Sequence, residues 1–361
     1  MVNYRCWHSE VKSAKSKREG ETMELDSRKK RILDSVISSY ISTGEPVGSK
    51  TLLDNMDLNV SSATVRSEMN ELEKMGYLCK PHTSAGRIPS EEGLRYYVNS
   101  SLDKYTLDER DLKMFMPAFR SCVGLLETIR SASACLAEFS GCTVFSAASS
   151  GGDGRFTFEV MPSGKRTVAI MAISDTGAVK SVFTKMDQDV TAEDCAKLTK
   201  LLNNVFADYP VSQIGGVRIM LFRDEVDRNC PRMSCVVVPV ANLVDKIKSY
   251  ELIVSGSEKV LSYPEFSNVE AAKEYFSLLS RHEDILSQLL DAEKSGDIHV
   301  SIGHENKLLG KLRASVVSVS GQARIPIVIG VLGPARMDYS KVIAGCKHVM
   351  LSLQEHIEKE F

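Results

Sequence analysis

Residues 61–90 read SSATVRSEMNELEKMGYLCKPHTSAGRIPS, and this stretch decides the fold of the first part of the chain. Its first half predicts a helix, because Ser61-Ser62 is a favourable N-cap pair, apolar residues return at three- and four-residue steps, and Gly76 stands where helices commonly end. Its second half predicts two short strands, since the run Tyr77 to Lys80 is followed by small, turn-forming residues at 83–86. The stretch is therefore a helix followed by a strand, a loop and a strand.

Helices are predicted on both sides of this stretch. On the N-terminal side, apolar residues recur at helical spacing from Ile32 to Ile41, Gly44 stands at a typical helix end, and Ser49 can cap a short second helix. On the C-terminal side, Ser90 and the two glutamates after it begin another helix. Helix, short helix, helix, strand, loop and strand is the order of a winged helix-turn-helix, which we place at residues 23–104.

The exposed side of the helix at 62–75 carries residue types that contact DNA. Val65, Met69 and Leu72 share one face, which leaves short polar side chains and the guanidinium of Arg66 on the remainder. These groups suit phosphate oxygens and base edges in a major groove. A solvated helix with ordinary caps would show similar residues, so the short helix before it and the strands after it are what favour DNA binding.

The loop between the two predicted strands has the properties of a wing. Its small residues would let it approach a phosphate backbone or a minor groove closely, and Arg87 supplies a cation that we expect to be its main DNA contact. His82 could equally pack beneath the loop. The residues that we predict to contact DNA are Lys50, Ser61, Ser62, Thr64, Arg66, Ser67, Asn70, His82, Thr83, Ser84 and Arg87.

Charge is distributed unevenly in this segment, although the whole chain carries a formal charge of only −2. No acidic residue lies between Asp57 and Glu68 or between Glu73 and Glu91, and these are the two stretches expected to face DNA. That side is therefore neutral to basic. Because affinity for DNA grows with the number of phosphates neutralised, so few bases predict that two copies bind one site.

Length and composition restrict the remaining possibilities. A chain of 361 residues with 43% apolar residues predicts two or three folded domains, and no apolar run approaches the ~20 residues of a membrane helix. The nine cysteines include no C-x-x-C pair, which predicts reduced thiols in a cytoplasmic protein with no metal site and no cofactor. Residues 1–22 are polar and lack the apolar core of a secretory signal, so we expect a disordered or mis-annotated extension there.

Seven motifs carry a resemblance to a known family. They are VSSATVR (60–66), LEKMGYL (72–78), PHTSAGRIP (81–89), GLRYYV (93–98), PEF (264–266), IGHEN (302–306) and GPARMDYS (333–340). With these motifs, the chain from about Leu25 to near its C-terminus resembles the bacterial heat-inducible transcription repressor HrcA family. The extension, the Ser- and Gly-rich residues 147–154, and His304, where the family more often has an acid, depart from the family pattern.

The resemblance implies an α+β, multidomain protein. The winged helix-turn-helix would be followed by a GAF-like domain at 105–205 and 297–361, which would carry an inserted dimerising domain at 206–296. The resemblance also implies a homodimer that binds double-stranded DNA at an inverted-repeat operator upstream of chaperone operons, in the bacterial cytoplasm and on the nucleoid when bound. A GroEL-type chaperonin would keep the repressor active, and diversion of the chaperonin to unfolded proteins on heat shock would release the operator.

Patterns in the rest of the chain fit this organisation. Strands are predicted at 166–173 and 179–185, joined by a hairpin turn, and a further β-rich run is predicted at Cys235 to Val240. Helical spacing predicts one or two helices between Val269 and Leu290 and a closing helix from Tyr339 to Lys359.

Two other functions can be argued from the residues. His82 and Ser84 could act as base and nucleophile, but no acid follows in the loop and no glycine elbow frames the serine, so we predict no catalytic residue. Alternatively, a repressor could be gated by a small metabolite bound in the GAF-like domain at Arg336. A turn in which Asp338 or Ser340 caps the last helix is the simpler interpretation of that motif.

Overall fold

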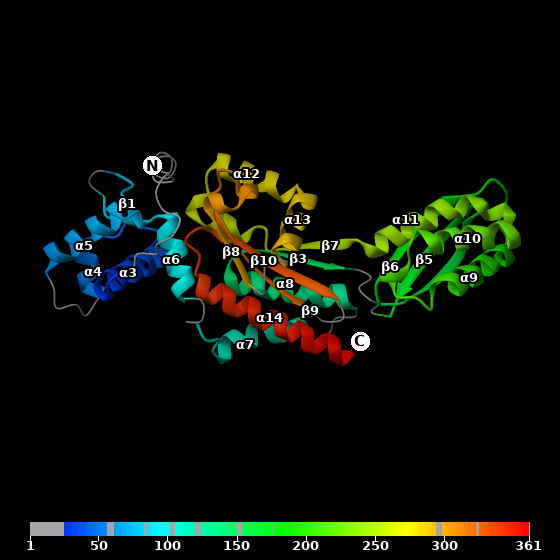
Figure 1. Ribbon diagram of the computed structural model, residues 1–361, viewed down its shortest axis with the longest axis horizontal. Helices are drawn as coiled ribbons and strands as arrows, with labels where there is room; N and C mark the ends of the chain where they lie inside the picture. The colour runs from blue at the N-terminus through cyan, green and yellow to red at the C-terminus, as the bar shows by residue number, and fades with distance from the viewer. Residues whose placement is uncertain are drawn as a thin grey trace. The chain divides into compact units, whose positions relative to one another are not determined.

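The computed structural model describes residues 25–55, 61–82, 85–101, 105–119, 124–149, 154–175, 177–293, 298–322 and 325–360. It contains both helices and strands (Figure 1). The chain divides into two units. The first unit holds the described residues up to Thr106 together with Val300–Val316 and Gly333–Ala344. The second holds Leu107–His299, Val317–Leu332 and the residues from Gly345 onward.

The helices in the first part of the chain are α3 (Ser27–Thr43), α4 (Ser49–Asn55), α5 (Ser62–Lys74) and α6 (Glu91–Ser101). The carboxylate of Asp26 caps α3 by accepting hydrogen bonds from the N–H groups of Arg28 and Lys29 at 3.0 and 2.8 Å. Gly44 ends the helix in the left-handed region, with a φ of 73°. The helices predicted from caps and spacing are confirmed.

An apolar core joins α3, α4 and α5. Its fully buried side chains are Ile32, Leu33, Val36, Ile37, Leu52, Val65 and Leu72. They recur at the helical steps found in the sequence, and burial of each contributes about 1.5–3 kcal/mol relative to exposure.

Two short strands follow α5. β1 (Leu78–Cys79) and β2 (Ile88–Pro89) pair antiparallel. Val47 adds an isolated bridge to Arg87, with N–H···O hydrogen bonds of 2.9 Å in both directions. Gly86 is required beside this bridge, because a Cβ there would lie 2.4 Å from the carbonyl oxygen of Val47. The two predicted strands on either side of the loop are confirmed.

A five-stranded sheet has the strand order β7-β3-β10-β9-β8. Its strands are β3 (Thr143–Ser149), β7 (Tyr250–Ser255), β8 (Ile298–Ile302), β9 (Ala314–Gln322) and β10 (Pro326–Pro334). β3 lies antiparallel between β7 and β10, and every one of its residues is buried. A strand with no exposed residue must be covered on both faces.

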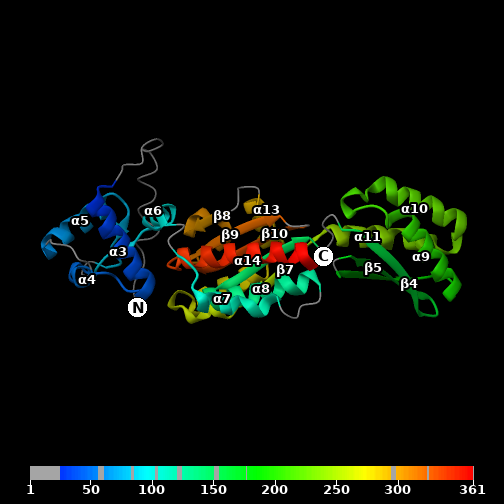
Figure 2. The same cartoon turned by 90° about the horizontal axis from the view of Figure 1, so that it is seen from below.

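Helices cover both faces of β3. The hydroxyl of Ser133 on α8 (Leu125–Ser140) lies 2.6 Å from that of Ser146, and the hydroxyl of Tyr275 on α12 (Val269–Leu279) lies 2.7 Å from that of Thr143. Residues three apart in a strand point to opposite faces, so α8 and α12 lie on opposite sides of β3. The long helix α14 (Tyr339–Glu360) runs beside α8 (Figure 2). α13 (His282–Glu293) contacts β3 and β7, and α7 (Glu109–Phe115) contacts α8.

A separate three-stranded sheet contains β4 (Phe156–Gly164), β5 (Thr167–Ser174) and β6 (Val179–Lys185) in that order. It shares one apolar core with α9 (Ala192–Phe206), α10 (Gly216–Asn229) and α11 (Val237–Lys248), which gather on one side of the strands (Figure 2). The predicted hairpin is confirmed. This core runs from Phe156 to Ile247, whereas the inserted domain was expected at 206–296. The core begins earlier than expected, and it ends before β7 at 250–255, which pairs with β3 in the five-stranded sheet.

One predicted strand is wrong. Cys235 to Val240 lies in η3 (Pro231–Val236) and α11, both helical. The valines suggested a strand, but Val237, Val240 and Val244 are buried at helical spacing against the core, and burial outweighs β-propensity. The other 3-10 turns are η1 (Met116–Phe119), η2 (Val211–Gln213), η4 (Lys259–Ser262), η5 (Pro264–Phe266), η6 (Gly303–Glu305) and η7 (Lys307–Leu309).

Candidate nucleic-acid interface

The first turn of α5 brings together several of the predicted contact residues. Ser61 caps the helix, and its hydroxyl accepts a hydrogen bond from the N–H of Thr64 at 3.1 Å. The hydroxyls of Ser61 and Thr64 are 2.9 Å apart. The hydroxyl of Ser62 lies 3.1 Å from that of Ser49, which links α5 to the start of α4. These serines and this threonine therefore hold the helix end in place, whatever else they contact.

The outer side of α4 and α5 carries the charged and polar residues. Lys50, Arg66 and Ser67 are exposed, whereas Val65 and Met69 on the inner side of α5 are buried. The division of α5 into an apolar and a polar side is as predicted from its sequence.

The acidic residues of α5 are all paired with bases. Glu68 and Glu71 lie 3.3 and 3.0 Å from the ammonium of Lys29, and Glu73 lies 2.8 Å from the guanidinium of Arg87. Hydrogen bonds to Asp26, Glu71 and Glu68 raise the pKa of Lys29 above its ordinary value. The negative charge of α5 is thus balanced within the protein.

Arg87 is placed differently from what the sequence suggested. Its residue is only 8% exposed, and besides the contact with Glu73 its guanidinium donates to the side-chain oxygen of Asn70. These contacts tie β2 to α5. The buried position does not favour the predicted role of Arg87 as the main DNA contact, because a side chain must reach the surface to meet a phosphate.

The loop itself is only partly described. His82 is exposed, and its carbonyl accepts a hydrogen bond from the N–H of Ala85 at 3.0 Å. Thr83 and Ser84 lie outside the described residues. The predicted contacts at Thr83 and Ser84, and the alternative pairing of His82 with Ser84, therefore remain sequence-based.

Arg336, the candidate ligand residue, lies at the end of α3. Its guanidinium donates to the carbonyl oxygen of Ile41 at 3.2 Å. Asp338 caps α14, since its carboxylate accepts a hydrogen bond from the N–H of Lys341 at 3.1 Å. Asp338 therefore provides the helix cap that the sequence offered as the simpler interpretation.

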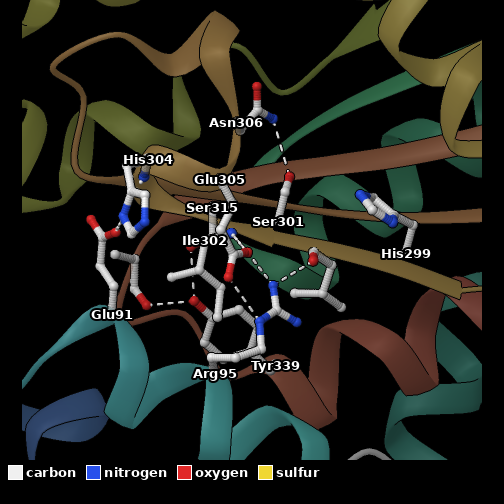
Figure 3. Close-up of polar contacts among 12 residues, drawn as sticks. Glu91, Arg95, His299, Ser301, Ile302, His304, Glu305, Asn306, Ser315 and Tyr339 are labelled. Carbon is white, nitrogen blue, oxygen red and sulfur yellow. Dashed lines mark hydrogen bonds and ion pairs between the residues drawn. The ribbon is translucent and has the colours of Figure 1, made fainter. Parts of the chain in front are cut away.

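Sequence reasoning missed one polar cluster. Glu91 and Arg95 on α6 point toward His304 and Glu305 in the turn after β8 (Figure 3). Arg95 belongs to the motif GLRYYV, and His304 and Glu305 belong to IGHEN, but nothing along the chain indicates that these two segments meet.

The described ranges contain neither a metal-ligand cluster nor a membrane-spanning helix. No group of three or more His, Cys, Asp or Glu side chains there is arranged to hold a metal ion. No helix among these residues is long and apolar enough to cross a membrane.

Similarity to known proteins extends over most of the chain. Residues 127–343 match the family model described as HrcA protein C terminal domain. The chain is 32% identical over 346 residues to the heat-inducible transcription repressor HrcA of Acetivibrio thermocellus, covering 93% of this chain and 97% of that protein. It is 32% identical over 344 residues to the protein of the same name from Clostridium botulinum, covering 94% and 99%. A hypothetical protein with a crystal structure at 2.2 Å resolution has a similar fold, with a TM-score of 0.66 and 22% identity, covering 93% of this chain and 99% of that one.

Proposed function

The chain belongs to the HrcA family of heat-inducible transcription repressors, and from that premise we propose that it binds as a homodimer to an inverted-repeat operator upstream of chaperone operons. A GroEL-type chaperonin maintains the active repressor, and heat shock releases the operator by diverting the chaperonin to unfolded proteins. The protein acts in the bacterial cytoplasm and lies on the nucleoid when it is bound to double-stranded DNA. The part of the chain built on the five-stranded sheet is the GAF-like domain of this proposal.

The surface of α4 and α5 is the observation that supports DNA binding. Lys50 on α4 and Arg66 and Ser67 on α5 are exposed. The acidic residues of α5 are paired with basic residues of the protein outside this helix. A polyanion approaching this side meets cations and hydroxyls rather than free carboxylates. We assign residues 25–101 to a winged helix with α5 as its recognition helix, and we retain Asn70, His82, Thr83 and Ser84 as secondary contacts.

The homodimer is supported by the outer face of the three-stranded sheet. The core side of this sheet is covered by helices, but Met161, Val179 and Phe183 on its other side are 46%, 55% and 64% exposed. Exposed apolar side chains grouped on one sheet face are typical of a protein interface. We propose that a second copy of the chain covers this face, and that the inserted dimerising domain is the segment from about 154 to 249.

Quantitative DNA binding tests the function. We expect tight, strongly salt-dependent binding to an inverted-repeat duplex and much weaker binding to a single half-site, measured at two salt concentrations. Addition of the GroEL-type chaperonin should increase the active fraction of repressor. Equal affinity for a scrambled duplex would refute the proposal, and an unchanged active fraction would remove the chaperonin from it.

Gating by a small metabolite is the alternative mechanism. A panel of metabolites tested for thermal stabilisation, followed by operator binding with each stabilising compound, would identify an effector. A compound that stabilises the protein and also changes operator affinity would support gating over chaperonin control.

A further inference from the structure

The contact between α6 and the turn after β8 is an extended polar cluster, which we call the α6 clamp and define as Glu91, Arg95, His304 and Glu305 (Figure 3). The guanidinium Nε of Arg95 donates to the carboxylate of Glu305 at 3.0 Å, and Nη2 contacts the second carboxylate oxygen. The same Nη2 donates to the carbonyl oxygen of Val300 at 2.6 Å. An arginine that donates to a carboxylate through two nitrogens fixes the orientation of the carboxylate as well as its distance.

Glu305 is itself held rigidly. Its carboxylate accepts a hydrogen bond from the N–H of Ile302 at 2.8 Å. This bond lies within the turn and does not depend on Arg95. Burial raises the pKa of Glu305, but the hydrogen bonds from Arg95 and Ile302 outweigh it and leave the pKa below its ordinary value. The carboxylate is therefore charged at neutral pH, as the clamp requires.

The second half of the clamp depends on a glycine. The carboxylate of Glu91 accepts a hydrogen bond from the N–H of His304 at 3.3 Å and contacts the Nδ1 atom of its ring. Gly303 has a φ of 52°, and a Cβ at this position would lie 2.0 Å from the Glu91 carboxylate. A side chain at this position would displace the Glu91 carboxylate, and the positive φ favours glycine there.

Arg336 makes a matching contact at α3. The partial negative charge of a helix C-terminus favours a cation, and the guanidinium of Arg336 reaches the Ile41 carbonyl there. A Cβ at Gly44 would lie 3.1 Å from this guanidinium. α3 in turn packs on α5. α6 packs on α3 and on β2. Both α3 and α6 are thus attached to residues from the last third of the chain.

The attached residues lie next to strands. Glu305 follows β8, and Arg336 follows β10 by two residues, so the clamp and Arg336 join α6 and α3 to chain segments that continue from strands of the five-stranded sheet. We infer that Arg95 and Arg336 are positioning residues for operator binding: they set the direction of α5 in each copy, so that two copies meet two half-sites at one spacing. This inference rests on the proposed function as a dimeric repressor.

Variants of Arg95 and Arg336 test the inference. In Arg95→Gln and Arg336→Gln, we expect affinity for the full inverted repeat to fall about tenfold or more and affinity for one half-site to change less than about twofold, because simultaneous engagement depends on geometry. Arg110→Gln is the matched control, since Arg110 is an exposed arginine on α7 and its loss removes the same charge. The double variant Arg95→Glu with Glu305→Arg should restore part of the lost affinity.

Hydrogen exchange provides a readout without DNA. Breaking the clamp should speed amide exchange in α6 and η6 of the free full-length protein, and the charge-swapped double variant should slow it again. Unchanged exchange and unchanged full-repeat affinity would overturn the inference, as would an equal loss on the full repeat and the half-site. Lack of preference for an inverted repeat in the unmodified protein would instead refute the proposed function, and the exchange rates would still decide whether the clamp exists.

Discussion

Arg87 is a buried cation whose contacts lie within the protein. Its guanidinium lies 2.8 Å from Glu73 and also donates to Asn70, and both partners are on α5. A charge buried this far is stable only while it is paired, so removal of either partner costs more than a surface ion pair would. The contact holds β2 against α5.

Replacement of Arg87 by lysine and by alanine separates the two roles. Lysine keeps the charge but cannot make the planar two-sided contact with Glu73 and Asn70. Both variants should therefore lower the free energy of unfolding, by about 1–3 kcal/mol, measured by urea denaturation. If Arg87→Lys instead keeps full stability and DNA affinity while Arg87→Ala loses only affinity, the sequence-based prediction of a DNA contact is right.

Arg66 is the exposed guanidinium nearest the start of α5. If it reads a base, Arg66→Ala should relax sequence preference at one operator position at a cost of roughly 1–3 kcal/mol. Lys74→Ala at the other end of the helix removes the same charge and serves as the control. A loss that is uniform across operator sequences would assign Arg66 to a phosphate instead.

At the scale of elements, buried polar side chains join helices to strands. Tyr275 on α12 is fully buried, and its hydroxyl contacts the Thr143 hydroxyl on β3 and donates to the Ser257 carbonyl, each at 2.7 Å. Burial raises the pKa of Tyr275 to about 12, although the hydrogen bond with Thr143 opposes the rise. Both hydrogen bonds matter for stability because the Tyr275 side chain is out of reach of solvent.

Tyr275→Phe should lower the free energy of unfolding at neutral pH by about 1–2 kcal/mol, because it leaves the Ser257 carbonyl and the Thr143 hydroxyl without their partner. The unfolded chain releases the tyrosine proton near pH 10 and the folded protein near pH 12, so the stability linked to this group is present below pH 10 and is lost as pH rises toward 12. Urea denaturation between pH 7 and pH 12 should therefore show a shallower alkaline decline in the variant. Identical slopes would contradict a raised pKa.

At the scale of the whole molecule, we propose a second copy because the segment expected to contact DNA carries few bases. The outer face formed by Met161, Val179 and Phe183 offers the surface for it. A dimer held there places two DNA-binding segments in one particle, and avidity then supplies the affinity that a few cations cannot.

Phe183→Glu should shift the protein toward monomer in analytical ultracentrifugation and weaken binding to the inverted repeat, because it puts a charge into the proposed interface. Val238→Glu is the control, since Val238 is 63% exposed on α11, within the helices on the core side of the same sheet. An intact dimer in Phe183→Glu together with dissociation of Val238→Glu would move the interface to the helical layer.

The local elements follow from the sequence alone. Asp26 and Ser61 cap their helices and Gly44 ends the first one, as expected, because each of these signals acts on backbone groups only a few residues away. The motifs also identified the family. The strand predicted at Cys235 to Val240 is wrong for the opposite reason. Whether this run forms a strand or a helix depends on burial against residues that are distant in the sequence.

Which cations are exposed depends on the tertiary structure. The sequence shows Arg66 and Arg87 as equivalent cations, yet one is exposed and the other is buried against Glu73. The pairing of Arg95 with Glu305 joins residues 210 positions apart. Electrostatic attraction depends on separation in space and on exclusion of water, and neither quantity is written in the order of residues along the chain.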